Sequence, residues 1–103
     1  MAINTPVDLS TLIGARADLH GGRPCLAGTG MTVHAIARRY LQDQRAEELA
    51  ADLPDISLSH IHAAIAYYLA NRERIDAELA EDEAEADRLF DNWQRERPSD
   101  PRH

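Results

Sequence analysis

The stretch from Gly21 to Val33 constrains the fold of this chain most, because it holds four of the chain's five glycines. Glycine occurs where the backbone needs a positive φ or a close neighbour, and Pro24 fixes its own φ and favours an extended residue before it. The pattern predicts a short strand around Pro24 with a turn on either side. We expect residues 17–20 to pair with residues 24–27 in a small β-hairpin, which is marginal unless a helix or a second copy of the chain covers it.

Apolar residues after this stretch recur at the spacing of amphipathic helices. Thr32 is the predicted N-cap of a first helix, and a second helix of about two turns follows over residues 46–53. Pro54 ends the second helix, and Ser57 or Ser59 is the predicted N-cap of a third. A short helix, a turn and a longer helix after a first helix form the outline of a tri-helical DNA-binding domain. The alternative is a small three-helix core that binds no nucleic acid.

The C-terminal part contains no glycine or proline from Leu58 to Arg97. A continuous helix of about 40 residues would measure roughly 60 Å, whereas a domain of about 70 residues is only about half as wide. We therefore expect the helix to leave the body near residues 71–75. The predicted divisions are an N-terminal arm (1–15), a β-hairpin and helix-turn-helix domain (16–72), an acidic helical extension for partner binding (73–97) and a disordered tail (98–103).

The formal net charge of −7 is concentrated in this extension. Residues 1–72 carry six arginines and seven acidic residues, whereas residues 73–103 carry five arginines and eleven acidic residues. An acidic segment repels nucleic acid and favours a basic protein partner, although the alternative is a solvated acidic face. An apolar stripe runs through it, and we expect its members to bind that partner: Leu79, Leu89, Phe90 and Trp93. Because like charges lie four residues apart, the extension is predicted to be marginal as a free helix and firm once this stripe is covered.

The third helix would be the recognition helix of a DNA-binding domain, yet it contains no Arg or Lys before Arg72. Phosphate contacts are therefore expected mainly from arginines elsewhere in the body. The predicted DNA-binding residues are Arg16, Arg23, Arg38, Arg39, Arg45, Ser57, Ser59, His60 and His62.

The sequence shows no catalytic constellation, and we expect neither enzymatic activity nor a bound metal or cofactor. Cys25 is the only cysteine, which excludes an intrachain disulfide and predicts a small buried apolar side chain. His60 and His62 are two residues apart and point to different helix faces, so they do not suit a two-His metal site. The glycine-rich stretch lacks the Gly-Lys-Ser/Thr ending of a phosphate loop. With no apolar run of about 18 residues and no signal peptide, the chain is expected to be cytoplasmic.

Several motifs together resemble those of family 433 of the domains of unknown function. They are Gly21-Gly22-Arg23-Pro24, Gly28-Thr29, Val33, Glu47-Glu48-Leu49, Leu53-Pro54-Asp55-Ile56 and Ala63-Ala64-Ile65-Ala66-Tyr67-Tyr68. The resemblance extends over about residues 19–75 and implies a homeodomain-like or winged helix-turn-helix fold in a mainly α chain. It also implies similarity to VapB-type antitoxins, many of which are encoded beside a PIN-like ribonuclease toxin. Many members have Arg after the Gly-Thr pair, where this chain has Gly30.

The resemblance implies an antitoxin of a type II toxin–antitoxin pair. Such a protein neutralises a PIN-like ribonuclease with its C-terminal segment and binds operator DNA as a homodimer with its body. Acidic residues 78–91 are expected to occupy the basic RNA groove of the toxin, and Arg88, Arg95 or Arg97 to pair with its metal-site carboxylates. The alternatives are a stand-alone DNA-binding regulator and a pure protein-interaction module without DNA binding.

Overall fold

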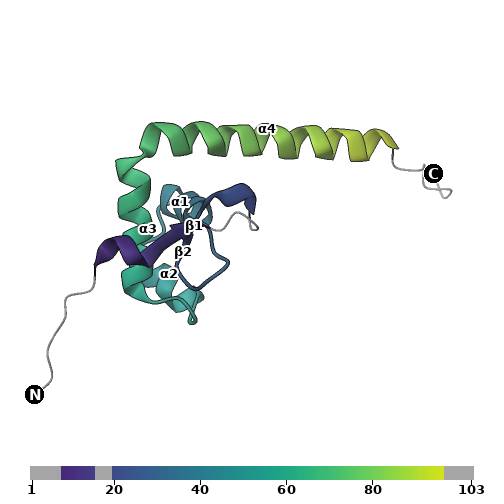
Figure 1. Ribbon diagram of the computed structural model, residues 1–103. Helices are drawn as coiled ribbons and strands as arrows, with labels where there is room; N and C mark the ends of the chain where they lie inside the picture. Colours follow the sequence, from purple (N-terminus) through teal and green to yellow (C-terminus); the bar gives the residue numbers. More distant parts are fainter. Residues whose placement is uncertain (1–7, 16–19, 97–103) are drawn as a thin grey trace, which may run out of the picture. The chain divides into compact units, whose positions relative to one another are not determined.

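The computed structural model describes residues 8–15 and 20–96 (Figure 1). In chain order the elements are η1 (Leu9–Leu12), β1 (Ile13–Ala15), η2 (His20–Gly22), β2 (Pro24–Leu26), α1 (Val33–Leu41), α2 (Ala46–Asp52), α3 (Leu58–Ala70) and α4 (Arg72–Glu96). A mainly helical chain with a small N-terminal hairpin and a long C-terminal helix confirms the predicted fold class. The chain divides into two compact units between Arg72 and Glu73. The predicted tail and residues 1–7 of the predicted arm lie outside the described residues.

The 3₁₀-helix η1 leads the chain into the hairpin, and Asp8 is its N-cap. The hydroxyl and the backbone N–H of Ser10 donate to Asp8 Oδ1 at 2.8 and 3.0 Å. The bond from the Ser10 hydroxyl, and after it the backbone bond, lowers the pKa of Asp8 from its ordinary value of 3.8. Leu12 at the end of η1 is buried, whereas Leu9 at its start is 70% exposed.

The hairpin joins β1 to β2 in an antiparallel pair. The residues that face each other are Ile13↔Leu26, Gly14↔Cys25 and Ala15↔Pro24. This register buries Leu12 and Leu26, and the backbone N–H of Ala27 donates to the carbonyl of Leu12 at 2.8 Å. Cys25 is 3% exposed, which confirms the prediction of a small buried side chain.

The strand predicted at residues 24–27 is confirmed to within one residue, but the expectation that residues 17–20 form its partner was wrong. Residues 17–19 lie outside the described residues, and His20 begins η2. Gly21 and Gly22 have φ values of 64° and 80°, yet they end η2 directly before β2 and form no two-residue hairpin turn. The reason is burial, since pairing through β1 places a leucine from each arm of the hairpin in the core.

A second turn follows β2, as the glycines predicted. Gly28 has a φ of 76°. Thr29 Oγ1 donates to the carbonyl of Leu26 at 2.8 Å and accepts from the N–H of Met31 at 3.1 Å. The N–H of Leu26 in turn donates to the carbonyl of Met31 at 2.9 Å. These bonds reverse the chain and bring Thr32 to the start of α1.

Side-chain caps fix where α1 and α3 begin: Thr32 is the cap predicted for α1, and Ser57 is one of the two caps predicted for α3. Thr32 Oγ1 accepts from the N–H of Ala35 at 3.0 Å, and Ser57 Oγ accepts from the N–H of His60 at 3.2 Å. Each bond satisfies one of the N–H groups that have no partner inside the helix. The helix α2 ends two residues before Pro54, also as predicted.

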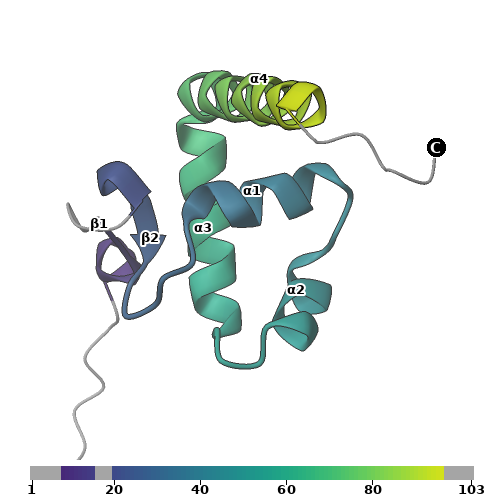
Figure 2. The ribbon, with the colours of Figure 1, turned by 90° about the vertical axis from the view of Figure 1, so that its right-hand side faces the viewer.

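The core of the first unit is built around α3, which contacts α1, α2, η1 and both strands (Figure 2). Its buried side chains are Ile61, Ala64 and Tyr68. The ring of Tyr68 packs edge-on against Tyr40 of α1, with ring centroids 6.1 Å apart. Other fully buried side chains come from the hairpin, α1 and α2: Leu26, Val33, Ile36 and Leu49.

Asn71 separates α3 from α4, so the continuous helix considered over residues 58–97 is interrupted. Its backbone N–H donates to the carbonyls of Tyr67 and Tyr68, both at 3.0 Å. Its side-chain Nδ2 donates to the carbonyl of Tyr67, also at 3.0 Å. One asparagine thus bonds the carbonyls of Tyr67 and Tyr68 in the last turn of α3, in a sequence without glycine or proline.

The helix α4 has 25 residues, which corresponds to about 37 Å at 1.5 Å per residue. Ile75 is its one buried residue, whereas every residue from Glu83 to Glu96 is exposed. Among residues 8–15 and 20–96, no helix is both long enough and apolar enough to cross a bilayer.

Candidate functional site

The second half of α4 exposes large hydrophobic side chains. Leu89, Phe90 and Trp93 have 59%, 55% and 53% of their surfaces exposed. The rings of Phe90 and Trp93 stack with their centroids 5.8 Å apart. Leu79 is only partly exposed. The structure therefore gathers three of the four predicted stripe residues near the C-terminal end of α4, and an exposed cluster of this kind marks an interaction surface.

Acidic side chains surround this cluster. Between Arg72 and Glu96, α4 carries ten acidic residues and four arginines, so the helix is strongly negative. The predicted partner-binding arginines make bonds within the helix: Arg88 pairs with Glu85, and Arg95 donates to the side chain of Asn92 at 2.7 Å. Exposed pairs of this kind contribute about 0–1 kcal/mol, so both arginines can change partners at little cost.

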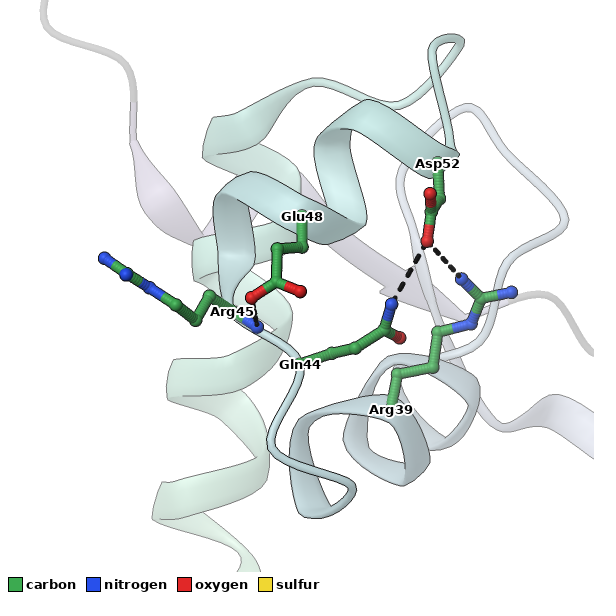
Figure 3. A network of polar contacts seen from close by, with 5 residues as sticks. All are labelled: Arg39, Gln44, Arg45, Glu48 and Asp52. Carbon is green, nitrogen blue, oxygen red and sulfur yellow. Dashed lines mark hydrogen bonds and ion pairs between the residues drawn. The ribbon is translucent and has the colours of Figure 1, made fainter.

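Arg39 and Arg45, two of the predicted DNA-binding residues, lie near the link between α1 and α2 (Figure 3). Arg39 Nη1 lies 3.7 Å from Asp52 Oδ2, and Gln44 Nε2 donates to the same oxygen at 3.1 Å. The backbone N–H of Arg45 donates to Glu48 Oε1 at 3.3 Å, while its side chain points away from the network (Figure 3). Arg39 is thus engaged with a carboxylate of the same unit.

Arg23 and Arg38 line a surface pocket of about 420 Å³. Thr32 and the buried His34 from the start of α1 also line it. Both arginines take part in further polar interactions. Arg23 and Arg38 are therefore together at this pocket, whereas Arg39 pairs with Asp52, and Arg16 lies outside the described residues.

The predicted hydroxyl and imidazole groups do come together, at the N-terminus of α3. Ser57 Oγ lies 3.0 Å from Ser59 Oγ and contacts His60 Nδ1. His62 is exposed. Because α3 carries no charged residue from Leu58 to Ala70, these groups are the polar chemistry that it offers to a base or phosphate.

A hydrophobic surface on the first unit was missed in the sequence. A pocket of about 380 Å³ is lined by Leu9, Ser10, Ile13, Ala63, Ala66 and Tyr67, from η1, β1 and α3. A signal was present, because α3 is apolar on nearly all sides from Ile61 to Ala70 and such helices are normally covered all round.

Among the described residues, no group of three His, Cys, Asp or Glu side chains is placed to hold a metal ion. The arrangement offers binding surfaces: an acidic helix with exposed aromatic rings, scattered arginines, and an uncharged face on α3.

Comparison with known proteins places the first unit in a family. A family model described as a protein of unknown function (DUF433) matches residues 13–68, which run from the start of β1 into α3. A crystal structure of a DUF433 member from Anabaena variabilis ATCC 29413 is similar, with a TM-score of 0.62 and 29% sequence identity. The similarity covers 70% of this chain and 71% of that chain. No curated protein matches. The resemblance seen in the motifs is confirmed, and the chain belongs to the DUF433 family.

Proposed function

We propose that this protein is the antitoxin of a type II toxin–antitoxin pair, a non-enzymatic protein that neutralises a PIN-like ribonuclease through α4. The observation that carries the proposal is the cluster of Leu89, Phe90 and Trp93, more than half exposed on a strongly acidic helix. Buried aromatic side chains dominate protein–protein binding energies. An RNA-binding groove is basic, so the acidic side chains around the cluster complement it electrostatically.

The physical state of α4 also suits this role. None of its residues from Glu83 to Glu96 is buried, so this part depends mainly on helix propensity and on pairs within the helix. Isolated helices shorter than about 12–15 residues are marginal in water. A partner that covers the apolar cluster therefore orders the helix as it binds, which is coupled folding and binding.

A role for the arginines follows from their weak local bonds. A toxin's metal-binding carboxylates present concentrated negative charge, which an arginine pairs with in bidentate geometry. Within the described part of the chain, Arg88 and Arg95 bond to exposed neighbours on α4. In the proposed complex, one of them leaves its neighbour on α4 and pairs with those carboxylates.

The test uses the full chain and a PIN-like ribonuclease encoded beside its gene. RNA cleavage by the ribonuclease is measured with wild-type protein, with the variant Phe90→Glu/Trp93→Glu, and with the control Leu41→Glu. Leu41 is 47% exposed but lies on α1, so the control adds a charge at a similar exposed site outside α4. We expect the wild type and the control to block cleavage and the α4 variant to lose inhibition. Full inhibition by the α4 variant, or none by the wild type, would overturn the proposal.

Operator binding is a second candidate function, favoured by the α2–α3 arrangement and by the exposed Ser57, Ser59 and His60 group. The uncharged α3 and the Arg39–Asp52 ion pair weigh against it. Gel shifts with upstream DNA, repeated at increasing salt, test it. We expect Arg38→Ala/Arg45→Ala to abolish a shift that Arg74→Ala leaves intact. Absence of a shift by the wild type at low salt would leave a protein-interaction module.

A further inference from the structure

The helix α3 is apolar on more sides than its own unit covers. From Ile61 to Ala70 the only ionisable side chain apart from the tyrosines is His62. The core covers one side of the helix, where Ile61, Ala64 and Tyr68 are buried. On the remaining sides Leu58 and Leu69 are 41% and 46% exposed. A helix that is hydrophobic all round is normally buried all round.

A different side of α3, which carries Ala63, Ala66 and Tyr67, faces the N-terminal segment. Leu9 and Ile13 lie across from Ala63, Ala66 and Tyr67, and together these side chains line the pocket of about 380 Å³. We call these five residues the η1–α3 face. Leu9 is 70% exposed at the rim, so a large apolar side chain stands beside an apolar hollow. A surface with both features can be complementary to a copy of itself.

We propose that the η1–α3 face is the contact between two copies of this chain. In a two-fold dimer the same patch meets itself, so a charged patch would oppose its own charge. The face has no charged member, and α3 as a whole has none from Leu58 to Ala70. A partner of basic or acidic character finds no charge there to complement. The strongly acidic α4, in contrast, is unsuited to contact with its own copy.

Small side chains allow the two helices to approach closely. Ala63, Ala66 and Ala70 are spaced i, i+3 and i+7 and lie on one side of α3. Helices pack at axis separations of about 8–10 Å when the residues at the contact permit it. Thirteen residues make α3 about 20 Å long. A contact along one short helix belongs with the small, weak interfaces, so the dimer is expected to dissociate in the micromolar range.

The test is sedimentation velocity on the full chain, from micromolar to submillimolar concentration. We expect a monomer–dimer equilibrium in the wild type. Ala66→Glu and Leu9→Glu should each raise the dissociation constant at least tenfold. Ala51→Glu is the matched control, because Ala51 is exposed on α2, and it should leave the equilibrium unchanged. Circular dichroism confirms that each variant keeps its helices.

A second measurement uses the burial of Cys25, which leaves an introduced cysteine as the exposed thiol. Under oxidation, the Ala66→Cys chain should form a disulfide-linked dimer and the Ala51→Cys chain should not. A wild type that stays monomeric at every concentration would overturn the proposal. A dimer that survives both glutamate substitutions, or equal cross-linking of the two cysteine variants, would also overturn it. Each of these outcomes is independent of whether α4 binds a ribonuclease.

Discussion

Replacement of Trp93 by alanine measures how much of the binding energy the exposed end of α4 supplies. The Trp93 side chain is 53% exposed in the free chain. For a side chain of roughly 250 Å², this leaves about 130 Å² for a partner to cover, and at about 25 cal/mol per Å² its burial contributes about 3 kcal/mol. Since 1.4 kcal/mol is a factor of ten, Trp93→Ala is expected to weaken binding to the PIN-like partner about 100-fold.

Calorimetric titration of the full chain with the partner measures this change. The control is Leu41→Ala, which removes a similarly exposed apolar side chain from α1 and should leave the affinity unchanged. Trp93 is the only tryptophan, so its emission in the wild-type chain should shift to shorter wavelength as the partner covers it. An unchanged affinity in Trp93→Ala, or an emission maximum that does not move on binding, would refute the reasoning.

Three further predictions concern the first unit. Gly28→Ala should lower the free energy of unfolding by about 1–2 kcal/mol because Gly28 has a φ of 76°. A Cβ at Gly30 would meet no atom within 4 Å, so Gly30→Ala should be neutral or stabilising by up to about 1 kcal/mol, and equal effects of the two substitutions in urea unfolding would contradict this. Ser57→Ala removes the cap of α3 and should cost about 1 kcal/mol in the same assay, and no loss would show that the cap is dispensable. The hydrogen bonds from Ser10 lower the pKa of Asp8, so the stability that they add is present above pH 3.8 and is lost as the pH falls through the lower pKa of the folded state. The amide signal of Ser10 in NMR should therefore titrate with a midpoint below pH 3.8, and a midpoint at or above that value would contradict the lowered pKa of Asp8.

The elements that the sequence predicted well are those with local chemical causes. The caps at Thr32 and Ser57 and the stop before Pro54 each depend on residues within one helical turn. The choice of β1 as the partner of β2 depends instead on side chains far apart in sequence, since this pairing accompanies the burial of Leu12 and Leu26 in the core. The end of α3 was expected near residues 71–75 from the length of the helix, but the cap was not, because the bond from Asn71 Nδ2 to the carbonyl of Tyr67 depends on the conformation of that side chain.

The same distinction applies to the surfaces. The exposed cluster at Phe90 and Trp93 was predictable, because a long run of acidic residues around an apolar stripe offers that stripe no cover within its own helix. The η1–α3 face was predictable only in part: the apolar sides of α3 are visible in the sequence, but Leu9 and Ala66 are far apart in sequence and meet only in the folded unit. The ion pair of Arg39 with Asp52 was not predictable for a similar reason, since the two residues lie on different helices and meet only in the folded unit.

The division of the chain between Arg72 and Glu73 has a consequence for the cooperativity of unfolding. All three tyrosines lie in the first unit, and the one tryptophan lies in the second. The part of α4 from Glu83 to Glu96 has no buried side chain to couple its melting to the core. On heating, helical circular dichroism and Trp93 emission should therefore begin to change before tyrosine emission does. The loss of structure is then a sequence of steps, and no single melting temperature describes the chain.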